Sequence, residues 1–231
     1  MIKITLDIET LPDQTPGALE ATEVSVPGQY KKPESIADYI KENLKDTWLR
    51  TSFDPLHGEL CAIGWAINDS EPVSLVRQQD DTEKALLESA YRNIGTEISL
   101  LPPAQIQIIG HNISWDLRFL AGRSWILGVR PPFDLPIDAY HGDRVYDTMI
   151  GFGGKKTIAY QDKNGKFVGL NNMISQERLA KALGIPGKFE GMDGSQVFSR
   201  WIAGDYEAIR QYNLSDIVTA RAIYKRLNWE K

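Results

Sequence analysis

The stretch that decides the fold is Ile2-Lys-Ile-Thr-Leu-Asp-Ile-Glu9. Isoleucine or leucine occupies every even position, a period of two that is typical of a β-strand with one apolar face. The same period places Asp7 and Glu9 on the opposite face, two residues apart. Two carboxylates at such a short distance repel each other, and a shared divalent cation removes the repulsion. The stretch therefore predicts a first strand that carries metal ligands.

A second acid, Asp116, lies in the segment Gly110-His-Asn-Ile-Ser-Trp-Asp116. The apolar run Ile106–Ile109 before it predicts a strand, and a helix is expected to begin at about Ser114. Asp116 would then occupy the first helical turn at the end of a strand, where α/β sheets commonly place ligands.

A third acidic motif, Tyr212-Asn-Leu-Ser-Asp216, lies near the end of the chain. Asp216 falls within an apolar stripe of helical spacing, which should face the core. An unpaired buried charge there would be strongly disfavoured, so this acid also requires a partner. The stripe consists of Ile209, Tyr212, Asp216, Ala220, Ile223 and Leu227.

The residue types point to magnesium or manganese chemistry. Both cations prefer hard oxygen ligands, and a pair of them can activate water and stabilise the departing oxygen of a phosphodiester. Four carboxylates suffice to hold the pair. The single cysteine, Cys61, and the three histidines show no zinc-ligand spacing.

These motifs resemble the DEDD, or DnaQ-like, 3′–5′ exonuclease superfamily, whose members carry an Asp-x-Glu strand, a middle Asp after an Asn, and a terminal Asp. Tyr212 matches the tyrosine subtype, because the histidine subtype would place His at position 211, which is Gln211. Leu183-Gly-Ile-Pro-Gly-Lys188, followed by Asp193-Gly-Ser195, is similar to predicted exonucleases related to the proofreading domain of family B DNA polymerases.

The resemblance implies an α/β fold of the ribonuclease H-like type, a central mixed β-sheet flanked by helices. It also implies 3′–5′ digestion with two Mg²⁺ or Mn²⁺ ions. The implied metal ligands are Asp7, Glu9, Asp116 and Asp216, and Tyr212 is implied to orient the nucleophilic water.

The resemblance and the local sequence also suggest substrate-binding residues. Thr10 and Leu11 would contact the terminal nucleotide, and Asn112 matches the asparagine before the middle acid. Phe119, with Trp115, flanks Asp116 and could stack on a base, as aromatic residues do in single-strand binders. Lys188 could contact a phosphate. The lysines of residues 151–169 could flank a phosphate path or belong to a solvated hairpin.

Each motif taken alone has a simpler reading. An Asp-x-Glu pair occurs by chance in a chain of this length, and Asp116 alone could be a helix-start acid that interacts with the helix dipole. Tyr212 alone could be a core residue. The order of the motifs, and Asp216 one turn after Tyr212 on the same face, favour the catalytic reading.

Composition fits one domain. The 231 residues are 42% hydrophobic, with no repeats and no long Pro/Gly linker, so residues 1–231 are expected to form a single domain with an insertion over the sheet at about 13–57. The net charge of −5 argues against bulk electrostatic binding of nucleic acid. No leader or membrane-spanning stretch is apparent, and a cytoplasmic location is expected.

Periodicity and turn residues predict the remaining elements. A helix is expected from Glu34 or Ser35 to about Leu49, and strands at 60–67 and 72–76 are expected to form a hairpin. Further predictions are helices at 82–93, 114–127, 175–183, 195–203 and 205–228, and a strand over 140–149.

Three functions remain open from the sequence. The first is a DNA exonuclease acting on single-stranded or frayed 3′ ends, and the second is an RNA 3′ exonuclease, because discrimination depends on contacts to the 2′-OH. The third is a non-catalytic nucleic-acid-binding subunit on the same fold, against which the intact acids argue.

Overall fold

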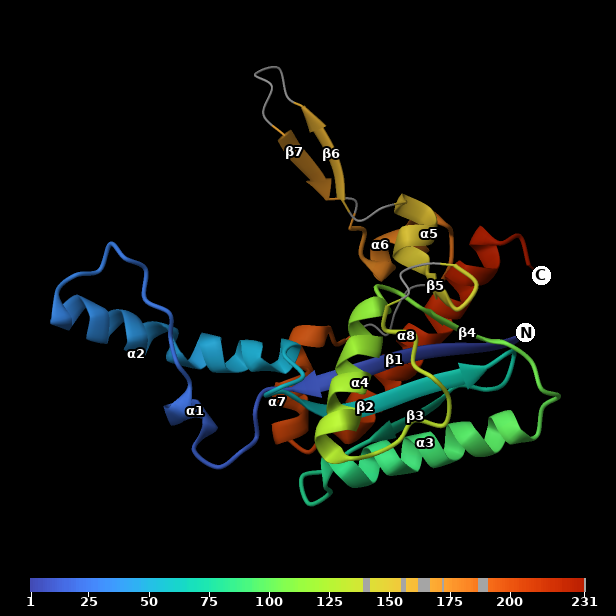
Figure 1. The fold of residues 1–231 in the computed structure, drawn as a ribbon, viewed down its shortest axis with the longest axis horizontal. Helices are drawn as coiled ribbons and strands as arrows, with labels where there is room; N and C mark the ends of the chain where they lie inside the picture. Colours follow the sequence, from blue (N-terminus) through green and yellow to red (C-terminus); the bar gives the residue numbers. More distant parts are fainter. Residues whose placement is uncertain (139–141, 155–156, 162–166, 172, 187–190, 231) are drawn as a thin grey trace.

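The computed structural model describes residues 1–138, 142–154, 157–161, 167–171, 173–186 and 191–230. Its centre is a mixed sheet of five strands in the order β3-β2-β1-β4-β5 (Figure 1). The strands are β1 (Ile2–Leu11), β2 (Glu59–Ile67), β3 (Val73–Val76), β4 (Ile106–Gly110) and β5 (Val145–Asp147). β1 pairs antiparallel with β2 and parallel with β4, and β2 and β3 form the expected hairpin. The predicted α/β class with a mixed sheet flanked by helices is confirmed.

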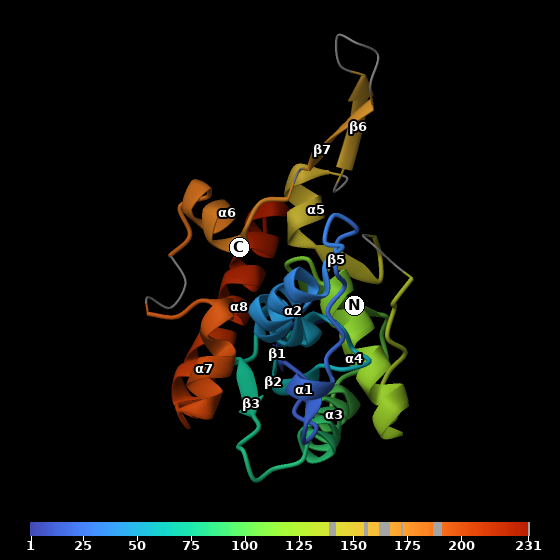
Figure 2. The ribbon, with the colours of Figure 1, turned by 90° about the vertical axis from the view of Figure 1, so that its left-hand side faces the viewer.

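The two faces of the sheet are covered by different helices (Figure 2). The even positions of β1 pack into the main core with α3 (Glu83–Ser99) and α4 (Ser114–Leu127). Leu11, at an odd position, packs with α7 (Val197–Ile202) and α8 (Tyr206–Leu227) on the other face. The alternation of β1 therefore turns its acids toward α8.

A buried ion pair fixes α4 to α3 and β2. The Arg123 guanidinium donates to both carboxylate oxygens of Glu83, at 2.8 and 2.5 Å. Glu83 also accepts the backbone N–H of Leu60, and Arg123 donates to the carbonyl of Pro55. Because these partners satisfy the buried charges, the pair holds α4, and with it Asp116, in a defined place.

Two predicted elements have different lengths in the structure. The helix expected at 82–93 continues to Ser99, because buried Ile94 keeps its second half packed on the core. Of the strand expected over 140–149, the described residues form only β5, and residues 139–141 lie outside the described part. β5 ends because Asp147 accepts the N–H groups of Met149 and Ile150 and so caps α5 (Thr148–Gly153).

The C-terminal half of the chain adds short elements around α8. β6 (Thr157–Gln161) and β7 (Phe167–Asn171) form an antiparallel hairpin, and α6 (Gln176–Ala182) follows it. The helix expected at 195–203 is divided into a 3₁₀ turn, η2 (Gly194–Gln196), and α7. The lysines considered at 151–169, namely Lys155, Lys156, Lys163 and Lys166, lie outside the described residues.

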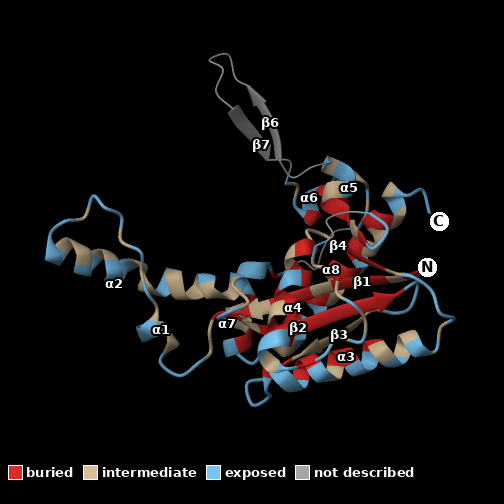
Figure 3. Cartoon of the chain, in the orientation of Figure 1, coloured by how far each residue is buried: buried red, intermediate tan, exposed pale blue. Residues whose placement is uncertain are grey.

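The segment between β1 and β2 forms an arm, defined as residues 12–57. It contains α1 (Ala18–Ala21), α2 (Pro33–Leu49) and a 3₁₀ turn, η1 (Arg50–Phe53). The expectation that this insertion covers the sheet is wrong: α2 extends away from the body and has no buried residue (Figures 1 and 3). The arm is joined to the body near the end of α2, where the Trp48 ring packs edge-on against Phe198 of α7 with 5.2 Å between ring centroids.

Within the part of the chain that the structure describes, every helix is too short or too polar to cross a membrane.

Candidate active site

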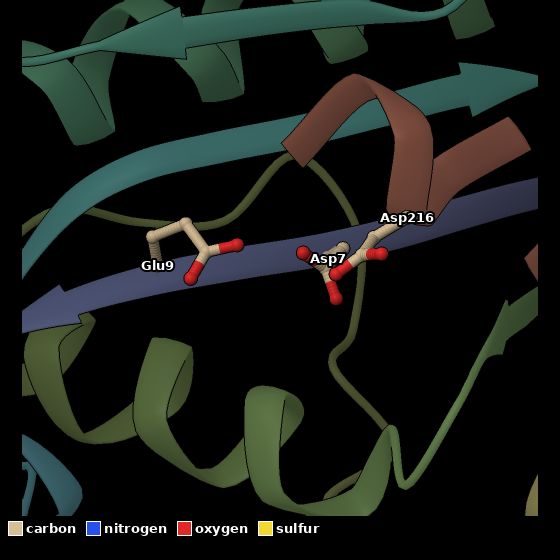
Figure 4. A group of neighbouring side chains, drawn as sticks. All are labelled: Asp7, Glu9 and Asp216. Atoms are coloured by element: carbon tan, nitrogen blue, oxygen red, sulfur yellow. The ribbon is translucent and has the colours of Figure 1, made fainter. Parts of the chain in front are cut away.

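Three carboxylates meet on the α8 side of the sheet. One oxygen each from Asp7, Glu9 and Asp216 lies within 4.8 Å of the other two. Glu9 and Asp216 are buried, at 8% and 5% exposure, and Asp7 is half-buried. Figure 4 shows Asp216 reaching from α8 to Asp7, with Glu9 further along β1. We call these three residues the acid cluster.

Local structure explains how the acid cluster assembles. Asp7 and Glu9 occupy odd positions of β1, and Asp216 lies on the stripe of α8 that packs against the sheet. The backbone carbonyl of Asp216 accepts a hydrogen bond of 2.8 Å from the Gln176 amide of α6. This hydrogen bond joins α6 to α8 without using the Asp216 carboxylate.

Asp116 contacts β1 along the edge of the strand that pairs with β4. β4 ends at Gly110, and its last residue paired with β1 is Ile109, opposite Thr5, so the edge of β1 beyond Thr5 is open to the chain that follows β4. There the Asp116 carboxylate accepts the N–H of Ile8 at 3.3 Å. Asp116 lies outside the acid cluster as defined above, although it interacts electrostatically with Asp7.

The pKa of Asp116 is raised well above its ordinary value. The main cause is burial, and the charge of Asp7 adds to it. Burial of this carboxylate in the metal-free protein is therefore costly, and a nearby cation would offset the cost.

Asp116→Asn should raise the melting temperature of the metal-free protein. Because the folded-state pKa is raised, folding favours the protonated acid, and stability is lost as the pH rises above about 4, where the unfolded carboxyl ionises. Asparagine keeps the acceptor for Ile8 without the charge. In thermal unfolding with EDTA, the gain should be largest at neutral pH, with about 2–4 °C for each kcal/mol relieved, and vanish near pH 4. A lower melting temperature at pH 7 would contradict this assignment.

Tyr212 lies against the acid cluster. Its ring is buried at 8% exposure, and its hydroxyl donates a hydrogen bond to the Asp216 carboxylate. Burial raises the pKa of Tyr212 well above its usual value, and the charges of Asp216, Glu9 and Asp7 raise it further. The hydroxyl therefore stays protonated and acts as a hydrogen-bond donor.

The donor set of the acid cluster fits a hard divalent cation. Three carboxylate oxygens within 4.8 Å of one another provide the ligands that Mg²⁺ or Mn²⁺ prefers. Two of the three side chains are buried, so the mutual repulsion of their charges is weakly screened in the absence of a cation.

Two of the residues predicted to bind the substrate do not lie on an accessible surface in the structure. Leu11 and Phe119 have 0% and 1% of their surface exposed, so neither can contact a base in this conformation, which corrects that expectation. Both belong to apolar cores. The Thr10 hydroxyl donates to the carbonyl of Ser52 and so joins β1 to the arm. Lys188 lies outside the described residues.

Asn112 forms the turn between β4 and α4. Its φ of 59° is left-handed, a conformation that asparagine tolerates better than most residues. Its N–H donates to the buried Asp147 carboxylate at 3.0 Å. Asp147 therefore holds this turn and caps α5. His111, with no assigned role in the sequence, links Thr148 and the carbonyl of Ile174.

Two features of the site were missed in the sequence. An aromatic surface beside Asp116 is formed by half-buried Trp115 and Phe53, whose rings lie 6.4 Å apart, and Phe53 is 66% exposed. Because Phe53 and Trp115 lie 62 positions apart, no local pattern links them. The second is Asn213, whose amide contacts Asp7 at 2.8 Å. Its position one residue after Tyr212, within the last motif, was the available signal.

A family model matches residues 51–230, and its description is "Predicted 3'-5' exonuclease related to the exonuclease domain of PolB". The chain belongs to this family. The matched residues include Asp116, Tyr212 and Asp216, whereas Asp7 and Glu9 precede them. No curated protein matches the chain.

Among solved structures, the chain is similar to the family B DNA polymerase from the hyperthermophilic archaeon Pyrobaculum calidifontis, with a TM-score of 0.53 and 14% identity. The similarity covers 99% of this chain and 24% of the polymerase, so the chain spans about a quarter of that protein's length. At this identity the similarity establishes the fold, which is the ribonuclease H-like arrangement expected from the sequence.

Proposed function

We propose that the protein is a metal-dependent 3′–5′ exonuclease that removes nucleoside monophosphates from single-stranded or frayed DNA ends. One observation carries the proposal. The acid cluster joins a strand and a helix that are far apart in the sequence of a chain that belongs to an exonuclease family. Buried carboxylates brought that close need a compensating charge, and a divalent cation provides it.

The proposed roles follow from these contacts. Asp7, Glu9, Asp116 and Asp216 would hold two Mg²⁺ or Mn²⁺ ions. When bound, such ions supply a nucleophilic water at neutral pH and offset the charge on the departing oxygen. Tyr212 would orient the attacking water through its hydroxyl oxygen, which can accept a hydrogen bond from the water while the hydroxyl hydrogen is donated to Asp216. In this account Asp116 remains a ligand although it lies outside the acid cluster in this structure.

The nucleic-acid substrate would be held locally. The net charge of −5 provides no bulk attraction for a long duplex. Phe53 joins Trp115 as a candidate for stacking on a base, in place of the buried Phe119, because Phe53 is exposed. Phe53 follows Ser52, which binds Thr10 beside Glu9, and Trp115 precedes Asp116. The aromatic surface is thus linked to both β1 and α4.

Digestion of 5′-labelled DNA and RNA oligonucleotides of matched sequence tests this function. With Mg²⁺ or Mn²⁺ we expect a ladder that shortens from the 3′ end of the DNA, and no products with EDTA. Faster digestion of the RNA would favour the RNA 3′ exonuclease. Binding without cleavage of either, under all metal conditions, would favour a non-catalytic nucleic-acid-binding subunit.

Tyr212→Phe should reduce single-turnover cleavage by about 100-fold or less. The variant keeps the buried ring but loses the hydroxyl and its hydrogen bond to Asp216, so the melting temperature should fall as it does when any buried hydrogen bond is removed, while the metal dependence should change little. Tyr206→Phe is a matched control, because its hydroxyl accepts the N–H of Gln79 at 3.1 Å and, among the described residues, forms no hydrogen bond with the acid cluster. Cleavage by Tyr212→Phe at the wild-type rate would reduce Tyr212 to a packing residue.

A further inference from the structure

Asp7 faces a glycine and a serine in a row across three strands. The strand registers pair Asp7 of β1 with Gly64 of β2, and Gly64 with Ser74 of β3. Residues directly opposite in neighbouring strands point to the same face of a sheet. Asp7 and Ser74 are therefore separated on the α8 face only by a residue that has no side chain.

Asn213 of α8 fills the space over this glycine. Its side chain is fully buried, and a Cβ on residue 64 would overlap its amide oxygen and lie 2.9 Å from its Cγ. Any larger residue at position 64 would displace Asn213. Gly64 has no positive φ, so the requirement here is space and not backbone conformation.

The hydrogen bonds of Asn213 use both ends of its amide. Its nitrogen donates to an Asp7 carboxylate oxygen at 2.8 Å and to the Asp7 carbonyl at 3.3 Å. Its oxygen accepts the Ser74 hydroxyl at 2.6 Å, and Ser74 is buried as well. Both Asp7 groups are acceptors, so the nitrogen must face Asp7 and the oxygen must face Ser74.

From this network we infer that Asn213 is a positioning residue for the metal site, set in place by Ser74 and by the absence of a side chain at Gly64. The inference rests on the proposed function, in which Asp7 is a metal ligand. Asn213 orients the Asp7 carboxylate before metal binds, and it does so from α8, the helix that carries Asp216. A ligand held in one orientation loses less freedom when it binds a cation, and loss of such an outer partner commonly costs about 10–100-fold in metal affinity.

The test compares Mn²⁺ binding to the metal-free protein by calorimetry with thermal unfolding in EDTA. Asn213→Ala should raise the Mn²⁺ dissociation constant by about 10–100-fold. Tyr91→Phe is the matched control, because it also removes a buried hydrogen bond, the 2.7 Å contact with Ser124, from a different part of the core. It should lower the melting temperature and leave the dissociation constant unchanged.

Gly64→Ala provides an independent variant, because it removes no polar group and the atoms nearest to the added methyl group belong to Asn213. It should weaken Mn²⁺ binding in the same direction by displacing Asn213. In the double variant with Asn213→Ala, the space above residue 64 is empty, so the two effects should not add. If Asn213→Ala does not fold, Ser74→Ala should show a smaller increase of the same sign.

The outcomes separate the inference from the proposed function. If the wild type binds Mn²⁺ and the Asn213→Ala and Gly64→Ala variants bind it with the same constant, the positioning role is overturned while the metal site stands. If the wild type binds no Mn²⁺, the proposed metal site is overturned, and the inference with it. Weaker binding in both variants, with the Tyr91→Phe constant unchanged, supports the inference.

Discussion

Asp7→Asn and Asp216→Asn should each reduce hydrolysis by more than about 100-fold while the protein stays folded. Loss of an outer partner of a metal ligand commonly costs about 10–100-fold, and loss of the ligand itself should cost more. Asparagine keeps the volume and one acceptor oxygen, so the packing around β1 and α8 is retained. The variant proteins should therefore melt at or above the temperature of the metal-free wild type, because repulsion within the acid cluster is reduced.

Single-turnover cleavage with Mg²⁺ measures the loss, with thermal unfolding as the test of folding. Asp38→Asn is the control, because it removes a carboxylate from an exposed position of α2. It should change neither quantity. Near-native turnover by Asp7→Asn or Asp216→Asn would remove that acid from the proposed metal site, and a marked drop in stability in both would indicate a structural role.

Much of the fold could be predicted from the sequence because its periodic patterns are strong. The alternation in Ile2–Leu11 predicted both the strand and the face that carries Asp7 and Glu9. The helix predicted from about Ser114 to about Leu127 spans Ser114–Leu127 in the structure. Where a side chain decides a boundary, as Asp147 does by ending β5, periodicity contains no signal, and the strand was predicted too long.

The sequence predicted a site residue correctly only where its residue type has a single plausible role at that position. An acid on an apolar stripe, such as Asp216, indicates chemistry because an unpaired buried charge is costly. An aromatic residue can belong either to the core or to a binding surface. Phe119 was therefore predicted to contact the substrate, whereas it lies in the core. The exposed partner of Trp115, Phe53, comes from the arm, and only the tertiary fold brings the two together.

Asn213 and Gly64 illustrate a second limit. Their contact joins α8 to β2, and it depends on the register that places Gly64 between Asp7 and Ser74. Register is a property of the paired strands and cannot be read from either strand alone. The glycine therefore appeared in the sequence as an ordinary strand residue.

The central claim is hydrolysis from a free 3′ end, and it is tested most directly with linear and covalently closed circular single-stranded DNA of the same sequence. With Mg²⁺ or Mn²⁺, we expect the linear DNA with a 3′-hydroxyl to be degraded to mononucleotides and the circle to stay intact. A 3′-phosphate should block degradation of the linear DNA, and Asp7→Asn protein prepared in the same way controls for a contaminating nuclease. Cleavage of the circle at a rate comparable to that of the linear DNA would show endonucleolytic cutting and would contradict the account.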